Sequence, residues 1–360
     1  MEALKFIWEG AIPLQIHLHE SEVTTVPPPP PAMVLAPRIG YLPLLASQIK
    51  PYFSSTLPPG VDTIWFEYKG LPLKWNIPTG VLFDLLCAEP ERPWNLTVHF
   101  RGYPKQLLIP CEGEESIKWS FINSLKEADY IFNGSSKNVM SLSQPDLVEL
   151  WRSVLNAGDL EAYLHISSKL KLGGTAHENA LKSISTVSLP GQNTDEVDIA
   201  GQLITGRIPV RLYVRNVGED LGDLEDAPPV NNWDDVSYIN RPIQINEEGK
   251  CFTLYDAVRS LLPELFPKKS TTEEEPSTVV GEEAQSDHRE QLHCSKAEQR
   301  EPISCDEHLQ TYHPSIKLVR IQGIEPKCQI PFSWVVNNLM NPEYFLHICV
   351  FLSVQQVNRC

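Results

Sequence analysis

The chain has 360 residues and a formal net charge of −16 at pH 7. Because domains typically run about 100–150 residues, this length predicts two or three domains rather than one. An acidic surface repels nucleic acid, so we expect no nucleic-acid partner. No apolar run reaches the length of about 18 residues that a transmembrane helix needs, and residues 1–15 lack the basic and apolar regions of a signal peptide.

Alternating apolar and polar residues dominate the first hundred positions. Ile12, Leu14, Ile16 and Leu18 alternate with polar side chains, which is typical of a half-buried strand. Similar patterns predict strands at 12–18 and 33–38, a helix at 41–53 ending against Pro51, strands at 64–70 and 71–78, a short helix at 79–88 and a strand at 94–100. This order matches the ubiquitin-like β-grasp fold, which we predict for residues 1–105, with an N-terminal helix included.

The same order of elements recurs in the second half of the chain. We expect strands at 207–215 and 236–246, a helix at 251–265, a strand at 316–323, a short helix at 331–340 and a last strand at 344–352. The segment GLPLKWNIP at 70–78 returns as GIEPKCQIP at 323–331, each time just before the short helix. We interpret residues 205–360 as a second copy of the first domain and expect Ile77 and Ile330 both to be buried.

Helical periodicity replaces alternation between the two copies. Apolar residues recur at helical spacing between Glu114 and Phe132, and Ser143 with Asp146 indicates a capping box that begins another helix. A third helix is expected from Asp159 to Leu172, ending at two glycines. The fold class is therefore α+β, with two ubiquitin-like β-grasp domains flanking a small helix-rich domain at 112–174 and a linker at 175–204.

Residues 267–313 differ in composition from the rest of the second copy. Acidic residues outnumber basic ones about two to one there, and apolar residues are few. We expect a disordered acidic loop that interrupts the domain and is dispensable for folding, since loop length costs only about 0.6 kcal/mol per doubling.

That loop also holds the residues best suited to bind a metal: His293, Cys294, Cys305, His308 and His313. Structural zinc sites take four ligands at short paired spacings, and only Cys305 and His308 form such a pair. Ordinary loop residues are the favoured interpretation. We therefore predict no metal and no cofactor.

Nothing in the sequence marks an active site. The chain contains neither G-x-S-x-G nor H-E-x-x-H nor a phosphate-binding glycine loop, and Cys111, although next to Glu112, has no feature of an activated nucleophile. The eight cysteines are scattered without a C-x-x-C pair, which indicates reduced thiols in a cytosolic protein. The internal Leu-Gly-Gly at 172–174 follows a helix and is interpreted as a helix stop, not as the tail of a ubiquitin-like modifier.

Several segments together resemble the autophagy-related protein 5 family, in its plant form. They are WEGAIPLQIHL (8–18), LAPRIGYLPLL (35–45), IWFEYKGLPLKWNIPTGVLFDLL (64–86), PWNLTVHFRGYP (93–104), NSLKEADYI (123–131), RIPVRLYVR (207–215) and IQGIEPKCQIPFSWVVNNLMNPEYFLHI (321–348). The resemblance covers nearly the whole chain apart from its linkers. The acidic loop 267–313 is the main departure.

This resemblance implies a non-catalytic subunit of a ligase-like complex. In that family a ubiquitin-like protein, autophagy-related protein 12, is joined covalently to a lysine in the motif NSLKEADYI. The resemblance therefore implies that Lys126 is the attachment residue in this chain. The conjugate would bind the coiled-coil autophagy-related protein 16. It would then promote transfer of autophagy-related protein 8 to phosphatidylethanolamine, with transient contact to that system's conjugating enzyme.

The expected location is the cytoplasm, with peripheral contact at the preautophagosomal membrane. The residues themselves add only that Lys126 lies on the helical face of Trp119 and Ile122, beside apolar surface that a modifier could cover. An alternative stays open, in which the chain is a non-covalent tandem ubiquitin-like scaffold of another trafficking complex.

Overall fold

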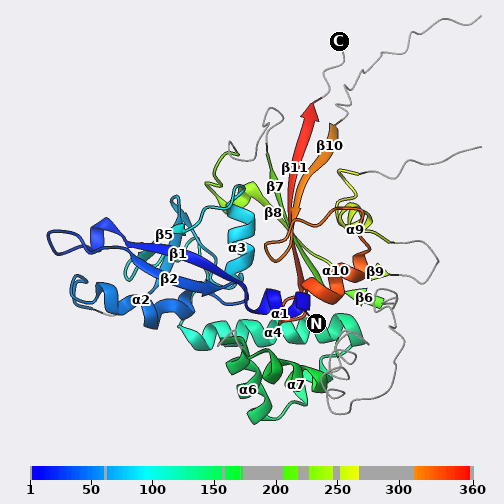
Figure 1. Ribbon diagram of the computed structural model, residues 1–360, viewed down its shortest axis with the longest axis horizontal. Coiled ribbons are helices and arrows are strands. Elements are labelled where there is room, and N and C mark those ends of the chain that lie inside the picture. The colour runs from blue at the N-terminus through cyan, green and yellow to red at the C-terminus, as the bar shows by residue number, and fades with distance from the viewer. Residues whose placement is uncertain are drawn as a thin grey trace, which may run out of the picture.

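Figure 1 shows the computed structural model, in which two sheet domains lie on one side of a helical layer. The structure describes residues 2–60, 63–155, 159–170, 172, 206–217, 227–245, 252–266 and 312–356. The predicted linker 175–204 and nearly all of the predicted loop 267–313 lie outside these ranges.

The first domain is a five-stranded sheet crossed by one helix. Its elements are α1 (Glu2–Trp8), β1 (Ala11–Leu18), η1 (Glu20–Glu22), β2 (Ala32–Pro37), η2 (Leu42–Leu45), α2 (Ala46–Phe53), β3 (Trp65–Tyr68), β4 (Leu71–Pro72), α3 (Thr79–Leu86) and β5 (Trp94–His99). The strand order is β2-β1-β5-β3-β4, and β1 and β5 are parallel neighbours. Every residue of α3 is buried, because the helix lies between its own sheet and the second domain.

The second domain repeats this arrangement. Its elements are β6 (Gly206–Ile208), β7 (Val210–Asn216), η5 (Trp233–Asp235), β8 (Val236–Asn240), β9 (Ile243–Ile245), α9 (Leu254–Leu261), β10 (Tyr312–Arg320), α10 (Phe332–Leu339) and β11 (Leu346–Gln356). The main sheet has the order β10-β11-β7-β8, with β7 and β11 parallel. In both domains the first and last strands are parallel neighbours, flanked by the second and third strands. The predicted common topology of the two halves is therefore confirmed.

Prolines account for most of the differences from the predicted strands. The predicted strand 207–215 is divided into β6 and β7 at Pro209, and 236–246 is divided into β8 and β9 at Pro242, because proline has no N–H to donate to a ladder. The strand predicted at 71–78 is only the two-residue β4. Pro51 lies inside α2, which continues to the fully buried Phe53. The predicted loop 267–313 is too long by two residues, since β10 begins at Tyr312.

The repeated segments occupy equivalent positions in the two domains. Lys69-Gly70 and Gln322-Gly323 all have positive φ, and Pro78 and Pro331 are the N-cap residues of α3 and α10. Ile77 is buried as predicted, with 8% of its surface exposed. The prediction for Ile330 is wrong: this side chain is half-buried at the margin of the second core, where its carbonyl accepts a 3.0 Å hydrogen bond from the Leu254 amide at the start of α9.

The two repeated glycines offer a matched test of local packing. Both have positive φ, 85° at Gly70 and 75° at Gly323, so alanine should cost roughly 1–2 kcal/mol at either position. A Cβ at Gly70 would meet nothing within 4 Å, whereas one at Gly323 would lie 2.7 Å from the Arg38 guanidinium carbon. We expect Gly323→Ala to lower the melting temperature clearly more than Gly70→Ala. Equal shifts in melting temperature would mean that the contact with Arg38 adds nothing to the cost of the substitution, and the prediction would be wrong.

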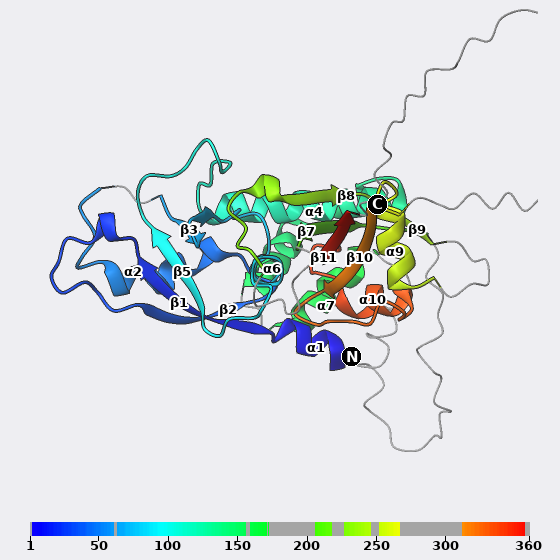
Figure 2. The ribbon, with the colours of Figure 1, turned by 90° about the horizontal axis from the view of Figure 1, so that it is seen from above.

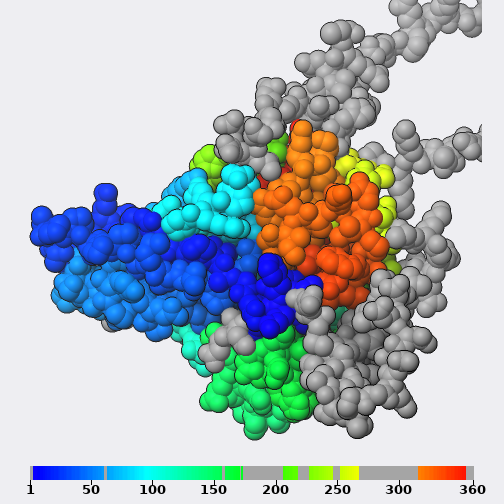
Figure 3. Space-filling view, viewed as in Figure 1, coloured from blue at the N-terminus to red at the C-terminus, as the bar shows by residue number. Residues whose placement is uncertain are grey.

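The helical layer consists of α4 (Glu114–Asn133), α5 (Lys137–Met140), α6 (Gln144–Leu155) and α7 (Leu160–Leu170). Helix α4 runs beneath both sheet domains (Figure 1). One apolar cluster joins all three parts of the chain and includes Trp8, Tyr41 and Trp75 from the first domain, Phe121 and Leu125 from α4, and Tyr344 and Phe345 from the second domain. Figure 2 shows α1 beside α10 at the edge of the molecule, and Figure 3 shows the dark blue α1 between the green helical layer and the orange α10. The helical layer therefore fixes the two sheet domains relative to each other.

Two buried arginines of the second domain hold the C-terminal end of α3. Arg215 on β7 donates to the carbonyls of Leu85 and Leu86 at 3.3 and 3.1 Å. Arg320 at the end of β10 donates to the carbonyls of Cys87 and Ala88 at 2.7 and 3.0 Å. These carbonyls lie at the negative end of the helix dipole and have few intrahelical partners. The guanidinium groups therefore satisfy them and tie the two domains together.

Asp84 adds a buried ionic contact to the same interface. Its carboxylate lies 2.5 Å from Arg38 Nη2 within the first domain and accepts a 2.7 Å hydrogen bond from the Gly323 amide of the second domain. Burial raises the pKa of Asp84, although Arg38 and the Gly323 amide act in the opposite direction. The repeated segment 323–331 is therefore anchored directly to the helix of the other copy.

Candidate modification site on helix α4

Helix α4 presents a rigid platform for the predicted acceptor lysine. It begins after Gly113 and ends at Gly134, which has the left-handed conformation common at helix ends. Its inner face is fully packed, with Ile117, Phe121 and Leu125 no more than 1% exposed. Near its end, the buried Asp129 carboxylate accepts a 3.1 Å hydrogen bond from the Val139 amide, which fixes the turn into α5.

The outer face of α4 carries an exposed stripe. We define it as Trp119, Asn123, Lys126 and Tyr130, which follow one another at helical spacing of three or four residues. Trp119 is 54% exposed and Tyr130 is 58% exposed, so two large aromatic side chains flank the lysine in sequence. Ile122 does not contribute to this surface, because it is buried. The apolar surface expected beside Lys126 is therefore aromatic.

Lys126 itself is half-buried, and its Nζ lies 6.0 Å from the centroid of the Trp119 ring. None of the acidic side chains in the described ranges forms an ion pair with it. The neighbouring Lys118 is different, because its Nζ lies 3.4 Å from Glu115 Oε1. Lys137 is exposed on the short α5. The Lys126 amine is thus held on a well-packed helix, without an ion-pair partner among the described residues.

A hollow of about 340 Å³ adjoins the stripe where all three parts of the chain meet. Asn123 and Glu127 of α4 line it, together with Lys74 from the first domain and Arg211 and Trp233 from the second. Arg211 Nη2 lies 3.1 Å from Glu127 Oε2, and Lys74 Nζ lies 4.4 Å from the Trp233 ring centroid. Burial lowers the pKa of Lys74, while Asp234 opposes the change. Both cations of the hollow therefore already have partners, since Arg211 pairs with Glu127 and Lys74 lies over Trp233. The hollow is part of the junction between the domains.

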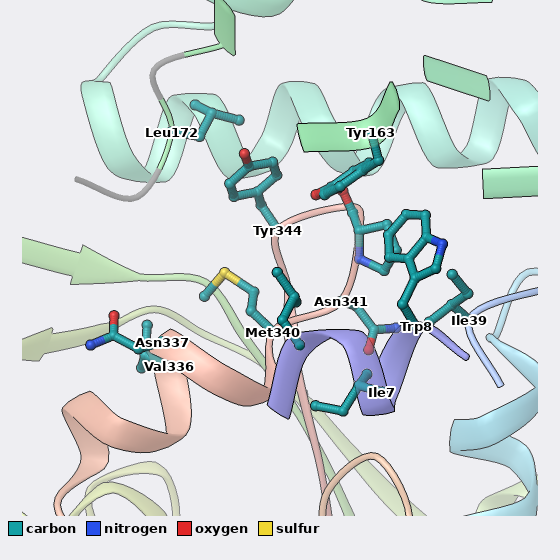
Figure 4. A pocket seen from close by; sticks show the side chains of 12 residues that line it. Ile7, Trp8, Ile39, Tyr163, Leu172, Val336, Asn337, Met340, Asn341 and Tyr344 are labelled. Atoms are coloured by element: carbon teal, nitrogen blue, oxygen red, sulfur yellow. The ribbon is translucent and has the colours of Figure 1, made fainter. Parts of the chain in front are cut away.

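A second hollow lies between α1, α7 and the segment that follows α10 (Figure 4). It is enclosed by Trp8 of α1, Tyr163 of α7, and Met340 and Tyr344 after α10. Its volume is only about 50 Å³, far below the roughly 300–1,000 Å³ typical of sites for small molecules or cofactors. It is a packing gap between mostly apolar side chains.

The described cysteines do not resemble catalytic nucleophiles. Burial raises the pKa of the thiols of Cys87, Cys111, Cys328 and Cys349, that of Cys87 to about 12. A reactive thiolate requires the opposite shift. Of the predicted loop residues, His293, Cys294, Cys305 and His308 lie outside the described ranges. Helix α7 ends at Leu170, and the glycines of the Leu-Gly-Gly segment also lie outside them.

In the described ranges, no helix combines the length and the apolar character that crossing a bilayer requires.

Two β-grasp domains docked on a helical layer define a protein with tandem ubiquitin-like domains. Family models agree: the Autophagy protein ATG5 UblA domain matches residues 7–100, its alpha-helical bundle region matches 114–173 and its UblB domain matches 207–350. The chain belongs to the autophagy protein 5 family and has a role in autophagy.

Individual relatives support the same assignment. Autophagy protein 5 of Arabidopsis thaliana is 58% identical over 99% of both chains, and that of Oryza sativa subsp. indica is 53% identical over 99% of this chain and 95% of its own. Autophagy protein 5 of Emericella nidulans is 38% identical over 74% of this chain and 85% of its own. The crystal structure of Kluyveromyces marxianus Atg5 shares the fold, with a TM-score of 0.62 at 19% identity over 97% of this chain and 100% of its own.

Proposed function

We propose that this protein is the covalent acceptor of the ubiquitin-like autophagy-related protein 12, through an isopeptide bond to Lys126. The observation that carries the proposal is the exposed stripe of α4, in which Lys126 stands between two exposed aromatic side chains without a carboxylate partner among the described residues. Trp119 and Tyr130 offer apolar area and polar edges to a modifier that lands on the stripe.

The chain would contribute position, and the conjugating enzyme would contribute the chemistry. The Lys126 amine, once deprotonated, attacks the carbonyl carbon of the modifier's C-terminal glycine in its thioester to the enzyme. An amide bond forms, the thioester bond breaks, and the enzyme's thiol recovers a proton. A base on the enzyme can remove the ammonium proton, so Lys126 needs only reach and a fixed direction.

The conjugate would then act as a non-catalytic subunit. It would bind the coiled-coil autophagy-related protein 16 and contact the conjugating enzyme of autophagy-related protein 8, promoting transfer of that protein to phosphatidylethanolamine. We infer a cytoplasmic protein that associates peripherally with the preautophagosomal membrane. The raised thiol pKa values of the described cysteines fit a subunit that supplies no nucleophile of its own.

The proposal predicts a branched peptide that can be identified directly. The chain is isolated from its own cells under denaturing conditions, digested, and analysed by mass spectrometry. We expect a peptide in which the C-terminal glycine of the modifier is bonded to the Nζ of Lys126. A branch at Lys118 or Lys137 instead would overturn the assignment of the residue, and the absence of any branch would favour the non-covalent scaffold.

A further inference from the structure

The loop between β1 and β2 carries a run of consecutive prolines, Pro27–Pro31, that the proposed function does not use. This loop is the dark blue end of the first domain that points away from the second domain in Figure 1. Pro27, Pro28 and Pro30 are exposed, and Val26 just before them is 98% exposed. The run is therefore open to solvent and lies away from the junction of the domains.

The sequence of the run determines its conformation. A proline ring fixes φ at about −65°, and a residue that precedes a proline is driven to extended backbone. Residues 27–30 are subject to both restrictions, and the peptide bonds that join the prolines of the run to one another are trans. Such a segment forms a polyproline II helix, which has about three residues per turn and no internal hydrogen bonds. In agreement, residues 28–31 belong to no hydrogen-bonded helix or strand.

Both ends of the run are anchored to the body of the domain. On one side, Thr24 Oγ1 donates a hydrogen bond to the carbonyl of the buried Thr56, and Thr25 Oγ1 lies 3.2 Å from Thr56 Oγ1. On the other side, Ala32 begins β2 opposite Ile16 of β1. A segment that is already fixed in this way loses little conformational freedom when a partner binds it.

We propose that Pro27–Pro31 is a docking site for a protein domain that binds polyproline II segments in an aromatic-lined groove. Because the helix repeats every three residues or so, Pro27 and Pro30 share one edge and Pro28 lies on the next. These two edges are exposed, whereas Pro29 on the third edge is partly buried. A groove of this kind can cover the two open edges, since its aromatic rings pack on proline rings and its Trp N–H or Tyr O–H groups donate to the backbone carbonyls.

The residues that flank the run indicate which groove it fits. The nearest charged residues in the sequence are Glu22 and Arg38. The buried Glu22 carboxylate accepts a 2.9 Å hydrogen bond from the Phe100 amide, and Arg38 is paired with Asp84. A groove that requires an ion pair beside the prolines would therefore find no charge to bind, whereas the exposed Val26 offers an apolar contact. We expect a groove that is aromatic and uncharged.

Titration of the full-length chain with purified polyproline-binding domains tests the proposal. The probes are a profilin, an EVH1 domain and a WW domain, each followed by calorimetry, and we expect at least one of them to bind. The double variant Pro28→Ala with Pro30→Ala should weaken this binding by about tenfold for each ring, because alanine lacks two of the CH₂ groups that the groove would bury. Failure of all three probes to bind the wild type would overturn the proposal.

Matched variants show whether the probe binds at the run. Pro59→Ala and Pro110→Ala change exposed prolines in other loops and should bind the probe as the wild type does. Unchanged affinity in the double variant would mean that the probe binds elsewhere, and would also overturn the proposal. Circular dichroism of each variant ensures that lost binding is not lost folding. Lys126→Arg should bind the probe normally, so the outcome does not depend on the proposed conjugation.

Discussion

Asp84→Ala should lower the free energy of unfolding by about 3–5 kcal/mol, because it leaves the buried guanidinium of Arg38 without its counter-charge. The variant also removes the acceptor of the Gly323 amide, which lies 2.7 Å from the carboxylate and belongs to the other sheet domain. A fall in the urea midpoint or the melting temperature measures the effect. Since the interface joins two domains, the loss should appear in the unfolding of both.

Two further variants identify the cause of this loss. Lys5→Ala removes an ion pair whose side chains are 68% and 61% exposed, so it should cost less than about 1 kcal/mol. Arg38→Met in the Asp84→Ala background removes the orphaned charge and should restore part of the stability, which a double-mutant cycle would detect. Additive losses would show that the ion pair does not couple the two residues.

Periodicity was enough to predict the architecture of the two sheet domains. Strands buried on one face alternate apolar and polar residues, and the repeated segments 70–78 and 323–331 revealed the second copy. Periodicity contains no information on where proline interrupts a ladder, so the divisions at Pro209 and Pro242 were missed. It also could not predict that Ile330 remains half-buried, because that depends on how the segment meets α9.

No local pattern in the sequence could predict the contacts between the domains. Arg215 and Arg320 look like ordinary charged residues of strands, yet both are buried against carbonyls of α3 that are more than a hundred positions away in the sequence. Lys126 was predicted from the family motif. Its exposed aromatic neighbour Tyr130 could have been found from the spacing along α4.

Lys126→Arg should abolish the conjugated form of the protein entirely. Arginine keeps the positive charge and most of the length, and its helix propensity is close to that of lysine, so α4 should remain folded. The guanidinium stays protonated and is a poor nucleophile, so no isopeptide bond can form. On a denaturing gel of plant-cell extract, the wild type should give a free and a heavier species, and the variant should give only the free one.

Lys118→Arg and Lys137→Arg are the matched controls, since both lysines lie on the same helical layer as Lys126. Lys118 is engaged by Glu115 at 3.4 Å, and Lys137 lies on α5, off the stripe. Both variants should keep the heavier species at the wild-type level. The Lys126→Arg protein should still bind the coiled-coil partner in a pull-down, because that contact is non-covalent. A heavier species that persists in Lys126→Arg but disappears in a control variant would transfer the acceptor role to that lysine.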